Sequence, residues 1–502
     1  CVQAAQGPSL AVPNCRVAVL VSPSGNVTRR RVSERLRMCS SGAPLHCSPD
    51  LEAHEMRVVR HPLVVAAAAA LALPATAQTP DAVDGSTWAI VIGIQVHEDD
   101  TLIPSRKGAY QTANAIYAYI ADPARGGIGA DHTRLLCEFG ADRRSIQAAF
   151  EEVRGLAKDS DRLLVYAGLR TALAADADGK ITGYFLPYDA KLDSLATTAI
   201  APADLAAWIS AVPARRRVVF LDAAFADAIR APGAENAAPP ADYLNLLGAS
   251  AAVIAATDGA KPVPEDGLEH PLLGFSLYTA MQGPGDKNRD GKLTFAEFLQ
   301  HHGDTVAAVY QGQEGNAPHP YSNGVEPEQV LAAVPQADPR CPDGTRLVGE
   351  VCMDMYESPN KPGAPVYNPG NWFGAVAVCQ QAGKRLCSTQ EWMLACQGPG
   401  WKYPYGNEYI DSYCNVGDTE GHLERVGSRP FCVSAWGIYD LIGNAQEWAG
   451  TEKKENATVL GGRFFDAPGE SIGCRESLVA GNPILEGAEL GMRCCIEPKP
   501  TE

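Results

Sequence analysis

The uneven distribution of cysteine is the feature that most constrains what this chain can fold into. Four cysteines lie before residue 50, one is Cys137, and the other ten lie between Cys341 and Cys495. Dense cysteines are typical of loop-rich domains held together by disulfides, whereas a domain with a large apolar core does not need them. We therefore expect two domains with different means of stabilisation, and 502 residues are also too many for one core.

The sequence from Met56 onward has the pattern of a signal peptide. Met56–His61 is basic, Leu63–Leu73 is apolar, and an Ala-Thr-Ala segment supplies small residues for cleavage before Gln78. The apolar run is too short to span a bilayer, and no cysteine follows the cleavage site to carry a lipid. We predict that residues 1–55 are an upstream leader, that residues 56–77 are the signal peptide, and that the mature protein is secreted or periplasmic, where disulfides persist.

The charge of the chain bears on its partners. A net charge of −17 argues against a nucleic-acid partner, because binding a polyphosphate requires a basic surface. We expect a protein, peptide or glycan ligand instead, and no membrane span.

Residues 86–310 read as an α/β domain. Apolar runs typical of buried parallel strands lie at Trp88–Ile94, Leu163–Gly168, Val218–Ala223 and Ala251–Thr257. Helical patterns lie between them, at Gly108–Ile120, Ser145–Leu156 and Pro202–Val212. This alternation predicts a mostly parallel sheet with helices on both faces, and with functional loops after the carboxyl ends of the strands.

The order of these segments resembles the caspase family, in its metacaspase-type branch (peptidase C14). Leu163–Gly168 sits where family members end a strand in Ser-Gly-His-Gly. Gly183–Asp189 resembles the segment that follows, and Val218–Ala223 resembles the strand that leads into Asp-Ala-Cys-His-Ser-Gly. The resemblance implies a three-layer caspase-like domain.

The resemblance places the catalytic histidine on Leu169 and the catalytic cysteine on Ala224. Neither residue can serve as a base or as a nucleophile, and cysteine chemistry depends on both. Cys137 is the only cysteine of the domain and lies in a predicted strand interior, which favours a buried hydrophobe. We predict a catalytically dead domain, with a peptidase that uses non-standard residues as the alternative.

Residues 286–297 fit a twelve-residue calcium loop of the EF-hand type. Gly291 allows its sharp turn, and a helix is expected to leave it over Phe295–Val309. The ligand positions are Asp286, Asn288, Asp290, Lys292, Thr294 and Glu297. We expect calcium here as a structural ion rather than as a switch, because only one such loop is evident.

Residues 311–339 are rich in Gly, Pro, Asn and Gln and read as a linker, and residues 340–498 read as the cysteine-rich domain. Gly383–Trp392, Trp436–Trp448 and Leu490–Arg493 resemble motifs of the formylglycine-generating enzyme family, also called sulfatase-modifying factors. The resemblance implies an α+β, loop-rich fold related to C-type lectins.

The enzymes of that family bind copper through two cysteines, and the resemblance places these on Asp466 and Ser471. The nearest thiol, Cys474, is expected to form a disulfide with Cys494 or Cys495 rather than to hold a metal. The adjacent Cys494 and Cys495 should bond to different partners. A pairing of Cys387 with Cys396 is plausible, and the connectivity of the ten cysteines stays open.

The same resemblance implies calcium at two further places in this domain. One is the loop from Asn444 to Glu447, and the other is the stretch Asn415-Val416. A hydrogen-bonded turn without an ion explains Asn444 and Glu447 equally well.

These features predict an exported, calcium-stabilised, non-catalytic binding or scaffold protein. Its aromatic residues either form a binding surface or fill the core: Trp372, Trp401, Tyr403, Tyr405 and Trp436. The alternatives are a divergent enzyme of the formylglycine-generating family, a caspase-like peptidase with non-standard residues, and a first domain that regulates an active partner.

Overall fold

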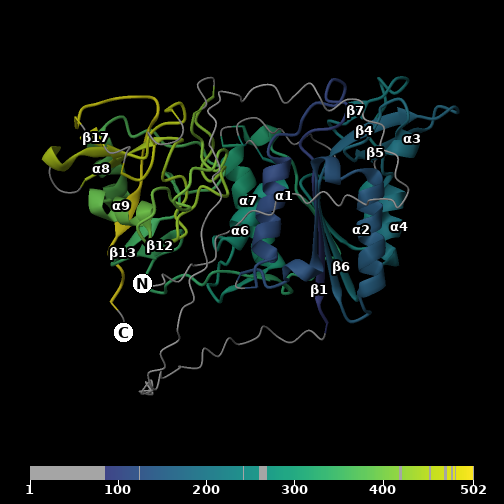
Figure 1. Ribbon diagram of the computed structural model, residues 1–502, viewed down its shortest axis with the longest axis horizontal. Helices are drawn as coiled ribbons and strands as arrows, with labels where there is room; N and C mark the ends of the chain where they lie inside the picture. The colour runs from purple at the N-terminus through teal and green to yellow at the C-terminus, as the bar shows by residue number, and fades with distance from the viewer. Residues whose placement is uncertain are drawn as a thin grey trace, which may run out of the picture. The chain divides into compact units, whose positions relative to one another are not determined.

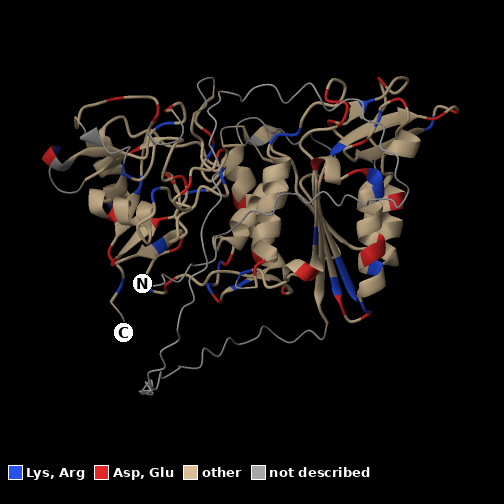
Figure 2. Ribbon diagram, viewed as in Figure 1, with Lys and Arg blue, Asp and Glu red and all other residues tan. Residues whose placement is uncertain are grey.

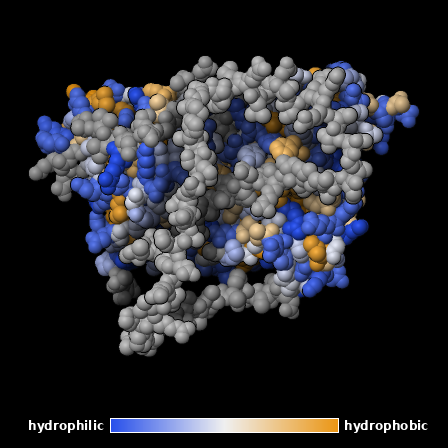
Figure 3. Space-filling model, viewed as in Figure 1, coloured by the Kyte–Doolittle hydropathy of each residue, from blue (hydrophilic) through white to orange (hydrophobic). Residues whose placement is uncertain are grey.

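The computed structural model describes residues 85–500, except for 124, 241, 259–267, 269, 312, 418–420, 451–453, 468–471, 476–478 and 481. The predicted leader at 1–55 and signal peptide at 56–77 lie outside these residues, as does Ser471. All the described residues belong to one compact unit. Acidic and basic residues are interspersed over its helices and strands (Figure 2), and the described part of the face in Figure 3 is mostly hydrophilic.

A six-stranded sheet forms the centre of the first domain, in the order β10-β8-β6-β3-β1-β2. Its strands are β1 (Thr87–Gly93), β2 (Thr133–Cys137), β3 (Arg162–Gly168), β6 (Arg216–Asp222), β8 (Ala252–Ala255) and β10 (Tyr321–Asn323). All neighbours are parallel except β10, which is antiparallel to β8. The predicted α/β fold of this domain is confirmed, and each of the four predicted strands lies within two residues of its expected bounds at either end.

Helices cover both faces of this sheet (Figure 1). Successive residues of a strand point to opposite faces, so that Ile90 and Ile92 pack in one apolar cluster while Ala89 and Val91 pack in another. The first cluster lies under α2 (Arg143–Leu156), α4 (Pro202–Ala211) and α5 (Tyr243–Gly248). The second lies under α1 (Ala109–Ile120), α6 (Leu272–Met281) and α7 (Phe295–Val309).

Smaller elements extend this domain. A three-stranded sheet joins β4 (Arg170–Ala175), β5 (Ile181–Leu186) and β7 (Ile229–Arg230), and α3 (Leu195–Thr198) lies between β5 and β7 in sequence. A two-stranded sheet pairs β9 (Lys292–Thr294) with β11 (Val330–Ala333). Short 3-10 helices lie at Ala130–His132, Glu138–Gly140, Glu314–Asn316 and Lys454–Asn456.

The stretch 311–339 is not a free connection between domains. It contributes β10 to the edge of the six-stranded sheet and β11 to the sheet beside the predicted calcium loop. The sequence is rich in Gly and Pro because the turns around these short strands need them. These residues therefore close the first domain.

The second domain is an α+β fold with two small sheets. One has the order β12-β13-β19-β14 and the other the order β17-β16-β15-β18. Their strands are β12 (Thr345–Val348), β13 (Val351–Asp354), β14 (Arg385–Leu386), β15 (Gln446–Ala449), β16 (Thr458–Leu460), β17 (Val479–Ala480), β18 (Leu490–Met492) and β19 (Cys494–Ile496). Two helices accompany them, α8 (Trp372–Gln381) and α9 (Thr389–Gln397).

All ten cysteines of the second domain are paired. The disulfides are Cys341–Cys352, Cys379–Cys494, Cys387–Cys495, Cys396–Cys474 and Cys414–Cys432. The prediction that Cys494 and Cys495 bond to different partners is confirmed. Two predicted pairings are wrong, because Cys474 bonds to Cys396 in α9, and Cys387 bonds to Cys495 in the neighbouring strand.

Candidate functional site

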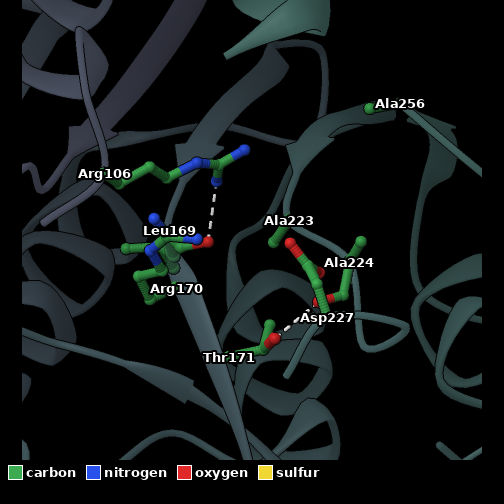
Figure 4. Close-up of a pocket in the computed structure, with 8 residues that line it drawn as sticks. All are labelled: Arg106, Leu169, Arg170, Thr171, Ala223, Ala224, Asp227 and Ala256. Atoms are coloured by element: carbon green, nitrogen blue, oxygen red, sulfur yellow. Dashed lines mark hydrogen bonds between the residues drawn. The ribbon is translucent and has the colours of Figure 1, made fainter. Parts of the chain in front are cut away.

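The structure brings Leu169 and Ala224 together at the carboxyl edge of the central sheet. β3 and β6 are parallel neighbours, with Gly168 opposite Asp222, so the residues that follow them leave the sheet side by side. Both Leu169 and Ala224 are buried. They line one small cavity, which we call the strand-end cavity, together with Arg106, Arg170, Thr171, Ala223, Asp227 and Ala256 (Figure 4).

Arg106 spans the two strand ends beside this cavity (Figure 4). Its Nη1 donates to the carbonyl of Leu169 at 2.7 Å and to the carbonyl of Asp222, and its Nη2 lies 3.2 Å from Asp222 Oδ1. Asp222 Oδ2 accepts from the Tyr166 hydroxyl at 3.2 Å and from the backbone N–H of Gly274 at 2.6 Å. Arg106 and Asp222 therefore form a buried, hydrogen-bonded ion pair that ties β3 to β6.

None of the described residues that line the strand-end cavity carries a thiol. The hydroxyl of Thr171 donates to the carbonyl of Ala224. Cys137 is buried at the end of β2, as predicted, and its Sγ lies 4.0 Å from Asn114 Nδ2. His97 follows β1 and is also buried, and its burial lowers the pKa of the imidazole to about 4. No local sequence pattern around His97 indicates that the side chain is buried.

The predicted calcium loop has its carboxylates turned inward. Asp286 Oδ1 accepts from the N–H of Arg289 at 2.7 Å, and its Oδ2 accepts from the N–H of Gly291 at 2.8 Å. Glu297 Oε1 accepts from two further N–H groups of the loop at 3.2 Å each. Its Oε2 accepts from the N–H of Thr294 at 2.9 Å, which completes a capping box at the start of α7.

The geometry of this loop fits an oxygen-coordinated cation in part. Gly291 has a φ of +81° and Arg289 a φ of +65°, so the chain turns sharply where the motif requires it. Burial raises the pKa of Asp286, as do the charges of Glu297 and Asp290. In the described part of the chain, however, no three His, Cys, Asp or Glu side chains converge as a preformed metal cluster. The loop brings the carboxylate oxygens together. A bound cation would have to compete for them with the backbone N–H groups whose hydrogen bonds they accept.

In the second domain, Glu447 is held by a buried cation. Its Oε1 accepts from Arg493 Nη2 at 2.7 Å, and its Oε2 accepts from Trp392 Nε1 at 2.6 Å. Arg493 and Glu447 are both fully buried, and Arg493 also donates to the carbonyls of Asp354 and Tyr439. Both carboxylate oxygens of Glu447 are thus already engaged by the domain's own side chains.

Asn415 and Asn444, which were expected at two separate calcium places, are in direct contact. Asn444 has a φ of +51°, its N–H donates to the carbonyl of Asn415 at 2.8 Å, and its Oδ1 accepts from Asn415 Nδ2 at 3.0 Å. Its Nδ2 donates to Glu357 Oε2 at 2.8 Å. Asn415 and Val416 lie so close to Gly443 that a Cβ there would come within 2.2 Å of the Asn415 carbonyl oxygen and 2.5 Å of Val416 Cγ2. These contacts describe the hydrogen-bonded turn that was the alternative here, and calcium at this place stays a prediction.

The positions that the family's copper cysteines would occupy hold no thiol. Asp466 pairs with Arg463 at 2.8 Å on the surface, and Ser471 lies outside the described residues. Cys474 is buried and bonded to Cys396. Among the described residues Cys137 is the one free cysteine, and it belongs to the first domain. None of the described helices has the length and apolar character needed to cross a membrane.

Comparison with known proteins identifies the kind of domain in the second half. Residues 291–498 match the model of the Sulfatase-modifying factor enzyme 1-like domain. The formylglycine-generating enzyme of Thermomonospora curvata is 27% identical over 216 residues, which are 36% of this chain and 68% of that protein. The inactive C-alpha-formylglycine-generating enzyme 2 of Mus musculus is 31% identical over 144 residues, which are 25% of this chain and 46% of that protein.

The similarity therefore concerns part of each protein. The formylglycine-generating enzyme of Bos taurus is 27% identical, and the chain spans 46% of its length. A Geobacter sulfurreducens protein of solved structure covers 50% of this chain at 12% identity, with a TM-score of 0.35. A structural likeness this low carries no argument about fold or function.

Proposed function

We propose that this chain is an exported, calcium-stabilised, non-catalytic binding or scaffold protein. In this proposal a caspase-like domain without catalytic residues precedes a domain of the formylglycine-generating enzyme type. The observation that supports it most strongly is the pairing of all ten cysteines of the second domain. Copper(I) chemistry of this family requires thiolates, and a disulfide offers none.

Proteins named as inactive are among the relatives that the second domain is similar to. Proteins named inactive C-alpha-formylglycine-generating enzyme 2, from Bos taurus and Mus musculus, match the chain at 29% and 31% identity. Asp466 is committed to an ion pair with Arg463, and Cys474 is committed to Cys396. The scaffold of the domain is thus retained while its metal-binding thiols are replaced or oxidised.

The strand-end cavity supports the same interpretation for the first domain. Leu169 and Ala224 lie at neighbouring strand ends, where a caspase would carry its base and its nucleophile. Arg106 and Asp222 form a buried ion pair across these strand ends. A peptidase mechanism has neither of the groups it needs at this place.

Calcium and export complete the proposal. The loop 286–297 supplies oxygen donors in the order that calcium prefers. It contains β9 and leads into α7, and β9 pairs with β11 at the end of the first domain. Five disulfides are stable in an oxidising compartment. The signal peptide predicted at 56–77 would direct the chain to such a compartment.

The catalytic question is tested by turnover and by thiol mapping on the full chain. We expect no conversion of a cysteine-containing peptide in the presence of copper(I). We also expect iodoacetamide to alkylate none of the ten cysteines from Cys341 to Cys495 under native conditions. Conversion of the peptide, or alkylation of Cys396 and Cys474, would favour the alternative of a divergent formylglycine-generating enzyme. Cleavage of peptides that depends on Arg106 or Asp227 would favour the alternative of an unusual peptidase.

The calcium proposal is tested by thermal unfolding with calcium and with a chelator. We expect calcium to raise the Tm of the wild type, because an ion that binds only the folded state stabilises it. Glu297→Gln should abolish the rise. Glu328→Gln changes an exposed carboxylate near β11 and should leave it intact. A rise that survives Glu297→Gln would place the ion elsewhere.

A further inference from the structure

Two helices of the first domain and the loop between them contact the second domain. α6 precedes the predicted calcium loop 286–297, and α7 leaves it. Buried side chains join the two helices, since Thr279 Oγ1 lies 2.9 Å from His301 Nε2 and Ser276 Oγ lies 2.8 Å from His302 Nδ1. These bonds tie α6, the loop and α7 into what we call the helix–loop–helix segment.

The first helix of this segment, α6, contacts a turn of the second domain at Gly427 and Ser428. The hydroxyl of Tyr278 donates to the carbonyl of Gly427 at 2.6 Å. His270, which precedes α6, is bonded through Nε2 to the carbonyl of Ser428, and the Ser428 hydroxyl donates to the carbonyl of Leu268 at 3.2 Å. The side chains of Tyr278, His270 and Ser428 are all buried, so the turn is anchored in the first domain.

The second helix, α7, packs against another turn of the second domain, at Gly363. Gly363 has a φ of +82°, and a Cβ at this position would lie 2.8 Å from Val309 Cγ2 and 3.5 Å from Thr305 Cγ2 in α7. The same Cβ would lie 3.4 Å from the ring of Phe275 in α6. The second domain therefore approaches both helices so closely that no side chain fits between them here.

The loop itself contacts the second domain through Arg289. Its Nη2 donates to the carbonyl of Asp338 at 2.7 Å, and its Nη1 lies 3.5 Å from Asp343 Oδ1. The carbonyl of Asp338 also accepts from the N–H of Cys341, which belongs to the disulfide Cys341–Cys352. Arg289 is thus tied to the residues where the second domain begins.

Arg289 lies between two expected ligands of the ion, Asn288 and Asp290. Asn288 Oδ1 accepts from the N–H of Asp290 at 2.9 Å, and Arg289 has a φ of +65°, so the backbone turns sharply here. A left-handed backbone is costly for a residue with a side chain. A cation held by the flanking oxygens offsets this cost and the repulsion between the carboxylates of the loop. Ion binding should therefore fix the position of the Arg289 guanidinium.

We propose that the helix–loop–helix segment is the joint between the two domains, and that calcium in its loop controls how firmly the second domain is held. This inference rests on the calcium site of the proposed function and adds a regulatory role to it. With the ion bound, the loop and both helices hold the second domain. Without the ion, the contacts of Arg289 are lost first, and the second domain is held by α6 and α7.

The test is hydrogen exchange, measured by mass spectrometry on the full chain with calcium and with a chelator. We expect the chelator to speed exchange of the amides at 338–345, while those of β1, inside the six-stranded sheet, stay protected. Arg289→Met should show the same fast exchange at 338–345 even with calcium, because it removes the contacts to the second domain and no expected ligand of the ion.

Lys287→Met is the matched control. Lys287 is a cation of the same loop, but it pairs with Asp304 of α7 at 3.1 Å, within the first domain. This variant therefore removes the same charge from the loop, and its exchange at 338–345 should remain that of the wild type. Equal exchange in Arg289→Met and Lys287→Met would overturn the inference, because the joint would not depend on Arg289.

The Tm separates failure of the joint from failure of the calcium site. If calcium raises the Tm and leaves exchange at 338–345 unchanged, the joint is wrong and the calcium site stands. If calcium changes neither the Tm nor the exchange, the calcium site of the proposed function and the joint are both wrong.

Discussion

The two domains reach stability by different routes. The first places a six-stranded sheet between two layers of helices, and apolar clusters fill both faces without a disulfide. The second has short strands, smaller clusters and five disulfides. The comparison teaches that the first domain is held by apolar burial on both faces of one sheet, whereas the second is cross-linked through its short strands and helices.

The largest expected effect comes from removing long-range disulfides in the second domain. Cys379–Cys494 closes a separation of 115 residues and Cys341–Cys352 one of 11. Loop-closure entropy predicts losses of about 5 and about 3 kcal/mol when each pair is replaced by alanine. Differential scanning calorimetry should show the second domain unfolding earlier while the first keeps its transition. Equal losses for both pairs would show that the other disulfides already shorten the larger loop.

The next largest effect is the loss of unfolding free energy when a buried arginine of an ion pair is replaced, which can be measured in each domain. Arg106→Met and Arg493→Met each leave a buried carboxylate, Asp222 or Glu447, without its cation. We expect each to cost about 3–5 kcal/mol in urea unfolding. Arg134→Met is the control, because its partner Glu152 is half exposed and such pairs contribute about 1 kcal/mol or less. If Arg106→Met costs no more than this control, Arg106 does not tie β3 to β6.

The smallest effect concerns Asp440, whose pKa is raised to about 7 by burial. The folded state favours the protonated form, so stability is full below the pKa of the unfolded chain, near 4, and falls as the pH rises toward 7. Asp440→Asn removes this loss and also suits the φ of +55°. We expect Asp440→Asn to raise the free energy of unfolding at pH 8 and to change it little at pH 4, where the carboxyl is largely protonated in the folded state and partly so in the unfolded state. A gain that does not change with pH would come from the backbone alone.

Periodic segments of the first domain were predictable because their burial is nearly complete. Val218–Ala223 was expected as a strand and β6 spans Arg216–Asp222. The helix at Phe295–Val309 was expected at its observed bounds, because the loop motif places Thr294 at its N-cap. β10 and β11 were missed, because such short strands carry no period of their own and depend on distant partners.

The sequence likewise locates some residues of the candidate sites and not others. Leu169 and Ala224 were each expected just after a predicted parallel strand, and they are neighbours because β3 and β6 pair and end at one edge of the sheet. Arg106 was not predicted, since its partner Asp222 is 116 residues away and no local pattern links them. The pairing of Cys396 with Cys474 likewise depends on the packing of α9, which cysteine spacing does not encode.

The position of Cys494 and Cys495 in the last strand has a consequence for how the protein is made. These two residues bond to Cys379 and Cys387, so they fasten β19 to α8 and to the residue after β14. Neither bond can close before synthesis has passed Cys379 and Cys387 by more than 100 residues. Until then Cys379 and Cys387 must remain reduced or pair wrongly. A cell that produces this protein therefore needs oxidation to follow the synthesis of Cys494 and Cys495, or a thiol isomerase to correct bonds that form earlier.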